Sequence, residues 1–449
     1  MSESTVPQKV MQKLAAGNNV PVSALACMGA LVVMTLVSVS LRAESLTDQA
    51  DPLIESVTDR VVAWRRDLHE HPELGNREFR TSALIAKHLR SLGMEVTTNV
   101  AHTGVVGILR GAADRPMIAL RADMDGLPVK EQVDLPFASK ATTQYGDREV
   151  GVMHACGHDN HMAILMGAAE VLAAMKDKIP GSIKFIFQPA EEGAPAGEEG
   201  GAAMMIKEGV LADVSAIFGL HVGPGQLGSI AYRPGGFMAS SDSFSITING
   251  RQTHGAVPWG GVDPIVVASQ VVLGLQTIPS RQLDSTLTPS IITVGKIQGG
   301  VRFNIIPDKV ELLGTIRTFD NEVRRDIHQR IKRTAESIAE SAGATATVTI
   351  DEGTPVTAND PELTSLMTET LEKAAGKNNV AIVPRTTTAE DFAYYQEQIP
   401  GLFIFLGVSD PEDKNPASNH SPYFYADERA LPIGVKAMTY LALDYLEKE

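Results

Sequence analysis

The chain has 449 residues, of which 43% are hydrophobic and 21% charged, a balance typical of soluble globular proteins. This length is sufficient for two or three domains with a large apolar core, so no disulfide framework is needed. The formal net charge of −15 argues against a nucleic-acid-binding surface, which would require clustered Lys and Arg.

Residues 1–45 have a basic start followed by an uncharged stretch over residues 20–41, which predicts a secretory signal with Ala43 near the cleavage point. The stretch is also just long enough to cross a bilayer as a helix. Three alternatives stay open: export to the periplasm or exterior after cleavage, a membrane anchor if the segment is kept, and a buried globular helix. Cys27 lies in this segment, so cleavage would leave Cys156 as a single thiol that needs a role other than an internal disulfide.

Residues 50–238 alternate between helical and strand-like patterns, which predicts an α/β domain with a largely parallel sheet flanked by helices. The apolar spacing predicts helices at 51–70, 78–92 and 162–175, and strands at 94–98, 104–110, 117–122, 183–188 and 216–220.

Residues 239–352 have a different order, β-α-β-β-α-β, which is the ferredoxin-like arrangement. The predicted elements are strands at 243–249, 291–297, 309–318 and 344–350, with helices at 264–278 and 321–342. Because α/β-like segments resume over residues 353–449, we expect this smaller domain to be inserted between two parts of the larger one.

Residues 153–161 (MHACGHDNH) are the most informative segment, with three histidines, a cysteine and an aspartate in nine positions. Cys156 and His158 are separated by one glycine, so both side chains can reach a metal cluster from one loop. Thiolate and imidazole ligands suit Zn²⁺ and other borderline transition ions. An isolated Cys-x-His would more often be a core cysteine beside surface histidines, but the density of ligand types favours a metal site.

Other metal-binding residue types follow predicted strands. Glu191 and Glu192 come directly after one buried strand, where ligands bind in α/β sheets, and one carboxylate could bind metal while the other moves a proton. His221 ends a second strand, and His420 lies in a polar turn. Alone, the glutamate pair would be a solvated turn and each histidine structural. Together with Cys156 and His158, the set exceeds one tetrahedral site and suits two ions sharing a water or hydroxide.

These motifs resemble the metallo-amidohydrolase family of aminoacylases and bacterial carboxypeptidases, in the branch of hippurate hydrolase and the auxin (indole-3-acetyl)–amino acid hydrolases. The resemblance runs from about residue 55 to the C-terminus. It is carried by residues 64–73 (WRRDLHEHPE), 120–128 (LRADMDGLP), 153–161, 188–192 (QPAEE), His221, 250–258 (GRQTHGAVP), 304–307 (NIIP) and His420.

The resemblance implies that Glu191 is the general base and that five residues bind metal: Cys156, His158, Glu192, His221 and His420. Other branches have a His-x-Asp element where this chain has Asp123-Met-Asp125, which leaves open which ligand bridges the ions. The implied cofactor is a pair of divalent ions, Zn²⁺ or Mn²⁺, with Co²⁺ and Ni²⁺ as further candidates.

The resemblance also assigns roles to the inserted domain, through which it implies a homodimer. His254 would stabilise the tetrahedral oxyanion in a neighbouring subunit, and Asn304 and Arg317 would bind the substrate carboxylate. Taken singly, these would be a turn histidine, a turn asparagine and a surface arginine. Glu390-Asp391-Phe392 would order the pocket, and His69, His71 and Asp125 would be supporting or structural residues.

The expected function is hydrolysis of N-acyl or N-aroyl amino acids to an amino acid and a carboxylic acid, by a metal-activated water with Glu191 as general base. A dipeptidase or carboxypeptidase could use the same machinery, because a dipeptide is also an amide beside a carboxylate. An inactive exported binding protein is a third alternative, disfavoured by the intact ligands. The sequence does not fix the preferred acyl group, amino acid or metal.

Overall fold

The computed structural model describes residues 44–448. The predicted signal or anchor segment lies outside this range, except for its last two residues. Within the range, no helix combines the length and apolarity that crossing a bilayer requires.

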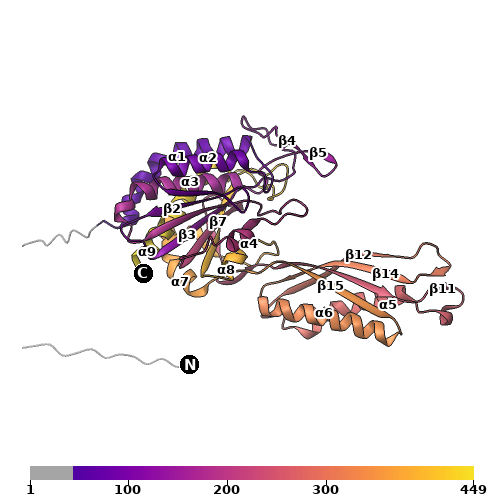
Figure 1. Ribbon diagram of the computed structural model, residues 1–449. Coiled ribbons are helices and arrows are strands. Elements are labelled where there is room, and N and C mark those ends of the chain that lie inside the picture. Colours follow the sequence, from indigo (N-terminus) through magenta and orange to yellow (C-terminus); the bar gives the residue numbers. More distant parts are fainter. Residues whose placement is uncertain (1–43, 449) are drawn as a thin grey trace, which may run out of the picture. The chain divides into compact units, whose positions relative to one another are not determined.

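A large eight-stranded sheet organises most of the chain (Figure 1). Its central strands, in the order β6-β3-β7-β18, are parallel, and its edges include antiparallel pairs. This confirms the predicted α/β class with a mostly parallel sheet. In spatial order, the strands are β1 (Glu95–Val100), β2 (Gly104–Arg110), β6 (Ser182–Gln188), β3 (Met117–Asp123), β7 (Ala216–Gln226), β18 (Gly401–Ser409), β8 (Ile230–Tyr232) and β17 (Val380–Ile382).

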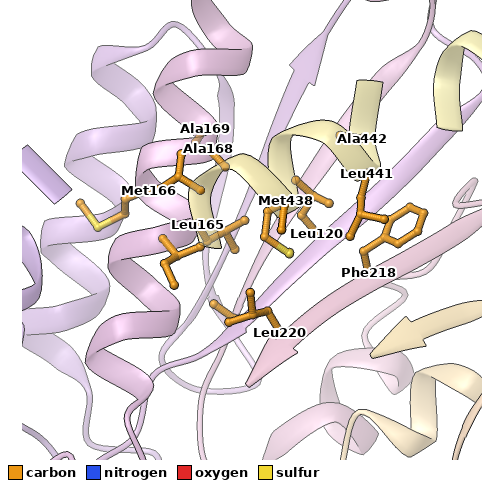
Figure 2. Packing of buried hydrophobic residues seen from close by; sticks show 14 of the residues in the cluster. Leu120, Leu165, Met166, Ala168, Ala169, Phe218, Leu220, Met438, Leu441 and Ala442 are labelled. Atoms are coloured by element: carbon orange, nitrogen blue, oxygen red, sulfur yellow. The ribbon is translucent and has the colours of Figure 1, made fainter. Parts of the chain in front are cut away.

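Five helices pack on one face of this sheet and two short helices on the other. The first group is α1 (Leu46–Glu70), α2 (Phe79–Ser91), α3 (His158–Ala174), α7 (Pro361–Ala375) and α9 (Leu431–Lys448), and the second is α4 (Gly201–Lys207) and α8 (Ala393–Gln396). Figure 2 shows Leu165 of α3 and Met438 of α9 packed near Leu120, Phe218 and Leu220 of the central strands. All five of these side chains are buried, which places the main core between these helices and the sheet.

The side chains of β3 alternate between the two faces of the sheet, and the charged ones lie near the carboxyl end of the strand. Ile118 and Leu120 belong to the core under α3 and α9, whereas Met117 and Ala119 face the α4 and α8 side. By the same alternation, Arg121 and Asp123 lie on the second face, where both are buried. The second face therefore changes from apolar to charged towards the carboxyl end of β3.

A separate four-stranded sheet, in the order β12-β14-β10-β15, has its own core with two helices. Its elements follow the chain order β10 (Ser241–Asn249), α5 (Pro264–Thr277), β12 (Ser290–Gly299), β14 (Lys309–Thr318), α6 (Asn321–Ser341) and β15 (Thr345–Thr354). This is the predicted β-α-β-β-α-β order. The residue boundaries given above for the domains stay predictions. Four short strands form two further pairs: β9 (Gly235–Met238) pairs with β16 (Thr357–Asn359), and β11 (Thr253–His254) with β13 (Ile305–Ile306).

Two local features differ from the sequence-based prediction. Helix α3 begins at His158 and not at residue 162, because its first turn is polar and has no apolar periodicity to reveal it. The chain also forms a β-hairpin that the sequence did not predict, between β4 (Thr142–Tyr145) and β5 (Arg148–Gly151). Its residues are mostly exposed and polar, so they lack the apolar alternation of a half-buried strand.

Candidate metal centre and active site

The candidate site lies at the carboxyl ends of three parallel strands. Strand β3 ends at Asp123, β6 ends at Gln188 just before Glu191 and Glu192, and β7 contains His221. Because these strands are parallel neighbours, their carboxyl ends meet at one edge of the sheet. This edge is where open α/β sheets bind ligands.

The structure brings all five predicted ligands together in two overlapping groups. The ligand atoms of Cys156, His158 and His221 lie within 4.8 Å of one another, and so do those of Cys156, Glu192 and His420. Cys156 Sγ is 3.3 Å from His221 Nε2, and His420 Nε2 is 3.0 Å from Glu192 Oε1. Cys156 belongs to both groups and lies between them.

The donor atoms of this cluster fit a metal centre. His158 Nε2 is buried without a hydrogen-bond partner among the described residues, and it lies 4.0 Å from Glu192 Oε1. A buried polar atom without a partner is costly, and a cation held between this nitrogen and the carboxylate would satisfy it. Thiolate, imidazole and carboxylate are the ligands that transition ions such as Zn²⁺ use. The cluster could therefore hold metal ions.

Backbone geometry explains how the loops converge. Gly157 has φ +96°, and a Cβ there would lie 2.3 Å from Val222 Cγ2, so only glycine fits between Cys156 and His158. The His420 N–H donates to Ala155 O at 2.8 Å. Asn419 Nδ2 donates to Cys156 O at 2.8 Å and to Val222 O at 3.1 Å. These bonds fasten the C-terminal loop to the cysteine loop and to β7.

Asp125 orients both halves of the site, as expected of a supporting residue. Its carboxylate accepts hydrogen bonds from the backbone N–H groups of Glu191 and Glu192, at 3.1 and 3.0 Å. It also lies 3.2 Å from His158 Nδ1, which leaves Nε2 of that ring free to face the cluster.

His161 is close to the cluster, but both of its ring nitrogens have partners. Its Nδ1 is 2.6 Å from Asp123 Oδ1, and its Nε2 accepts the Val222 N–H at 2.8 Å. His161 also forms a group with Asp123 and His158 whose ligand atoms lie within 4.8 Å of one another, but its two ring nitrogens already have these partners within the protein. His69 is similarly enclosed between Asp159 and Glu131, whereas His71 Nδ1 lies 2.8 Å from the backbone oxygen of Asp67.

Glu191 lies beside the ligand cluster in a strongly acidic environment. A carboxylate oxygen of Glu191 lies within 4.8 Å of oxygens of Glu390 and Asp391, and the Asp391 N–H donates to Glu191 Oε1 at 3.4 Å. Burial, and next the negative charge of Glu390, raise the pKa of Glu191 well above its usual value. A carboxylate beside cations would otherwise have a lowered pKa, so these neighbours favour a group that can accept a proton.

Arg121 is a central residue to which the sequence-based interpretation gave no role. It is fully buried and donates from Nη1 to Asp123 at 2.7 Å, from Nη2 to Asp391 at 2.8 Å, and from Nε to Gln188 at 2.9 Å. Its Nη2 is also 3.0 Å from Glu390. The signal was present in the sequence: an arginine inside an otherwise apolar strand must have a buried anionic partner.

Three predicted site residues lie in or beside the smaller sheet. His254 is exposed and accepts the Ala256 N–H, and the Gly255 N–H donates to Asn304 O at 2.9 Å, so His254 and Asn304 are neighbours. Arg317 Nη1 donates to Ser240 O at 3.3 Å. Among the residues that the structure describes, none of the three shares a hydrogen bond or ion pair with the five-ligand cluster. Their functional roles stay predictions.

The fold and the cluster together have the architecture of a metal-dependent hydrolase. Residues 119–444 match Peptidase family M20/M25/M40, and the chain belongs to this family. Its relatives in the family are enzymes that act on amide bonds.

Similar proteins place the chain in the predicted amidohydrolase branch. It is 40% identical to N-acetyl-L-cysteine deacetylase of Bacillus subtilis, over 88% of this chain and 90% of the relative. It is 38% identical to IAA-amino acid hydrolase ILR1-like 2 of Arabidopsis thaliana, over 88% of this chain and 87% of the relative. The crystal structure of Bacillus subtilis YXEP, described as a dinuclear metal-binding peptidase from the M20 family, has a TM-score of 0.74 and 36% identity, over 88% of this chain and 100% of that one.

Proposed function

We propose that this chain hydrolyses N-acyl or N-aroyl amino acids with two divalent ions, Zn²⁺ or Mn²⁺. The observation that carries the proposal is the convergence of five donor side chains from four separate segments, with Glu191 directly beside them. His158 Nε2 is 4.0 Å from Glu191 Oε2, so an amide at the cluster would lie within reach of the Glu191 carboxylate.

Together, five side chains would hold the ions: Cys156, His158, Glu192, His221 and His420. The Sγ of Cys156 belongs to both groups of ligand atoms. Ions bound there would polarise the scissile carbonyl and lower the pKa of a water molecule.

The chain's own part in the reaction is mainly proton transfer. Glu191 accepts the proton of the attacking water and delivers it to the leaving nitrogen, which gives the free amino acid. Asp125 keeps the backbone of Glu191 and Glu192 in place through its two hydrogen bonds. In this proposal His254 from a second copy of the chain stabilises the oxyanion, and Asn304 and Arg317 bind the substrate carboxylate.

Substrate profiling tests the proposal and separates it from a dipeptidase activity. The purified chain is loaded with Zn²⁺ or Mn²⁺, its metal content is measured, and release of amino acid is assayed from N-acetyl-amino acids, N-benzoylglycine and dipeptides. We expect turnover of acylated amino acids. Faster hydrolysis of dipeptides would favour the peptidase alternative, and a protein with two bound ions that cleaves none of these substrates would contradict an amidohydrolase.

Metal loading should release about two protons per centre near neutral pH. Burial, and next Glu192, raise the pKa of the Cys156 thiol well above its usual value, so this group is protonated before metal binds. Burial opposes the charge of His158, but Asp123 and Asp125 outweigh it and raise the pKa of His158 to about 10. Titration calorimetry with Zn²⁺ in two buffers of different ionisation enthalpy measures the released protons. A binding heat that is the same in both buffers would contradict the prediction.

A further inference from the structure

A cavity of about 820 Å³ opens beside the ligand cluster, with Glu192 and Asp125 among its lining residues. Four chain segments form its walls: residues 72–77, residues 125–128, the β4–β5 hairpin with the residues next to it, and residues 192–196. Its size lies in the range of cavities that enclose small organic ligands.

The charged groups of the wall are already paired within the protein. Glu73 accepts the backbone N–H groups of Arg80 and Thr81, and Arg77 is 2.6 Å from Glu198. Asp125 holds the backbone of the glutamate pair, and Glu192 belongs to the ligand cluster. Among the lining residues, all of which the structure describes, Arg77 is the one cation beside three carboxylates (Glu73, Asp125 and Glu192), so the wall disfavours a second negative charge on a ligand.

Each of the four segments also brings apolar side chains to the wall. These are Leu74, Leu127, Pro128, Val152 and Pro195, whereas Thr142, Thr143 and Gln144 of the hairpin are uncharged and polar. Tyr145 adds an aromatic ring from the hairpin, and its side chain is 58% exposed although it is large and hydrophobic. Such a surface gains free energy by covering an uncharged, apolar group.

We infer that this cavity receives the acyl group of the substrate and favours uncharged acyl chains of medium length and aromatic acyl groups. The inference rests on the proposed function. In that proposal the scissile amide lies at the ligand cluster and the inserted domain binds the substrate carboxylate. The acyl group is then the part of the substrate that still needs a binding site. The cavity adjoins the cluster at Glu192, so an acyl chain extends into it directly.

A series of substrates with one amino acid and different acyl groups tests the preference. We expect kcat/KM to rise at least about tenfold from N-acetyl- to N-hexanoyl-methionine, because each buried methylene contributes up to about fourfold. N-benzoyl-methionine should also exceed the acetyl compound, and N-succinyl-methionine should be the poorest substrate. Equal kcat/KM values along the series, or a preference for succinyl, would overturn the inference.

Two variants that narrow the cavity from different wall segments test where the acyl group binds. Ala141 lies next to strand β4 and Ala196 in the segment 192–196; each is replaced with phenylalanine, and neither residue belongs to the proposed catalytic machinery. Each should lower kcat/KM at least about tenfold for the hexanoyl and benzoyl substrates, and change it less than about threefold for acetyl. The matched control is Ala138→Phe, in the same loop as Ala141 but outside the cavity lining, which should leave the profile unchanged.

Substrate binding measured in a protein that does not turn over tests the cavity assignment independently of the proposed reaction. In metal-loaded Glu191→Gln protein, calorimetry should show N-hexanoyl-methionine binding at least about tenfold more tightly than N-acetyl-methionine, and Ala141→Phe should remove the difference. If the parent cleaves acylated amino acids but the variants affect all acyl groups equally, only the cavity assignment fails. If nothing is cleaved although the hexanoyl compound binds more tightly, the reaction fails and the cavity assignment stands.

Discussion

Replacing Glu191 with glutamine is expected to lower kcat by about 10³-fold while both metal ions remain bound. Glutamine has nearly the same shape as glutamate, and its side-chain oxygen can still accept the Asp391 N–H that reaches Glu191 Oε1 at 3.4 Å. It cannot take a proton from water at neutral pH. The loss should therefore appear in kcat more than in KM, because substrate contacts are unchanged.

Glu199→Gln is the matched control for this experiment. Glu199 lies in the same glutamate-rich stretch but is exposed, with an ion pair to Lys207 at 2.6 Å. Its substitution should leave kcat within about twofold of the parent. Steady-state kinetics and metal analysis of the parent, Glu191→Gln and Glu199→Gln test the prediction. Turnover by Glu191→Gln that equals the parent's would show that this carboxylate is not the general base.

Four of the five proposed ligands could be grouped from the sequence because each of them occurs in a local pattern. Glu192 and His221 follow or end apolar strands, and parallel strands bring such positions to one edge of a sheet. Cys156 and His158 occur together in a dense group of ligand types. The His420 position depended on the family resemblance, because its turn has no periodic pattern that places it next to Ala155.

Other parts of the site depend on long-range contacts that no local pattern records. Arg121 and Asp391 are 270 positions apart in the chain, so their ion pair could not be read from the spacing of either motif. The β4–β5 hairpin, which forms one wall of the cavity, is polar and mostly exposed and so has no core-facing alternation. In contrast, the smaller sheet has clear local patterns, because strand β10 and helix α6 each have one buried face.

The second large effect is expected in the buried charge network behind Glu191. Replacing Arg121 with methionine should lower the free energy of unfolding by about 3–5 kcal/mol, because it leaves the carboxylates of Asp123, Glu390 and Asp391 buried without their shared cation. Methionine has a similar length and fills much of the space, so a cavity contributes little to the loss. Urea denaturation in the presence of a chelator measures this loss separately from any change in metal binding.

The pH dependence of this loss distinguishes uncompensated charge from altered packing. Burial raises the pKa of Glu390 to about 8 and that of Asp391 to about 6, although Arg121 opposes both shifts. Because both values lie above those of the unfolded chain, the folded protein holds extra protons, and the resulting stability is lost as pH rises through about 6 and then about 8. Without Arg121 both values should rise further, so the deficit of Arg121→Met should be larger at about pH 8 than at about pH 5. Arg110→Met on strand β2 of the same sheet is the control: its pair with Glu95 is exposed, and it should cost less than about 1 kcal/mol at either pH. A deficit for Arg121→Met that is equally large at both pH values would assign the loss to packing.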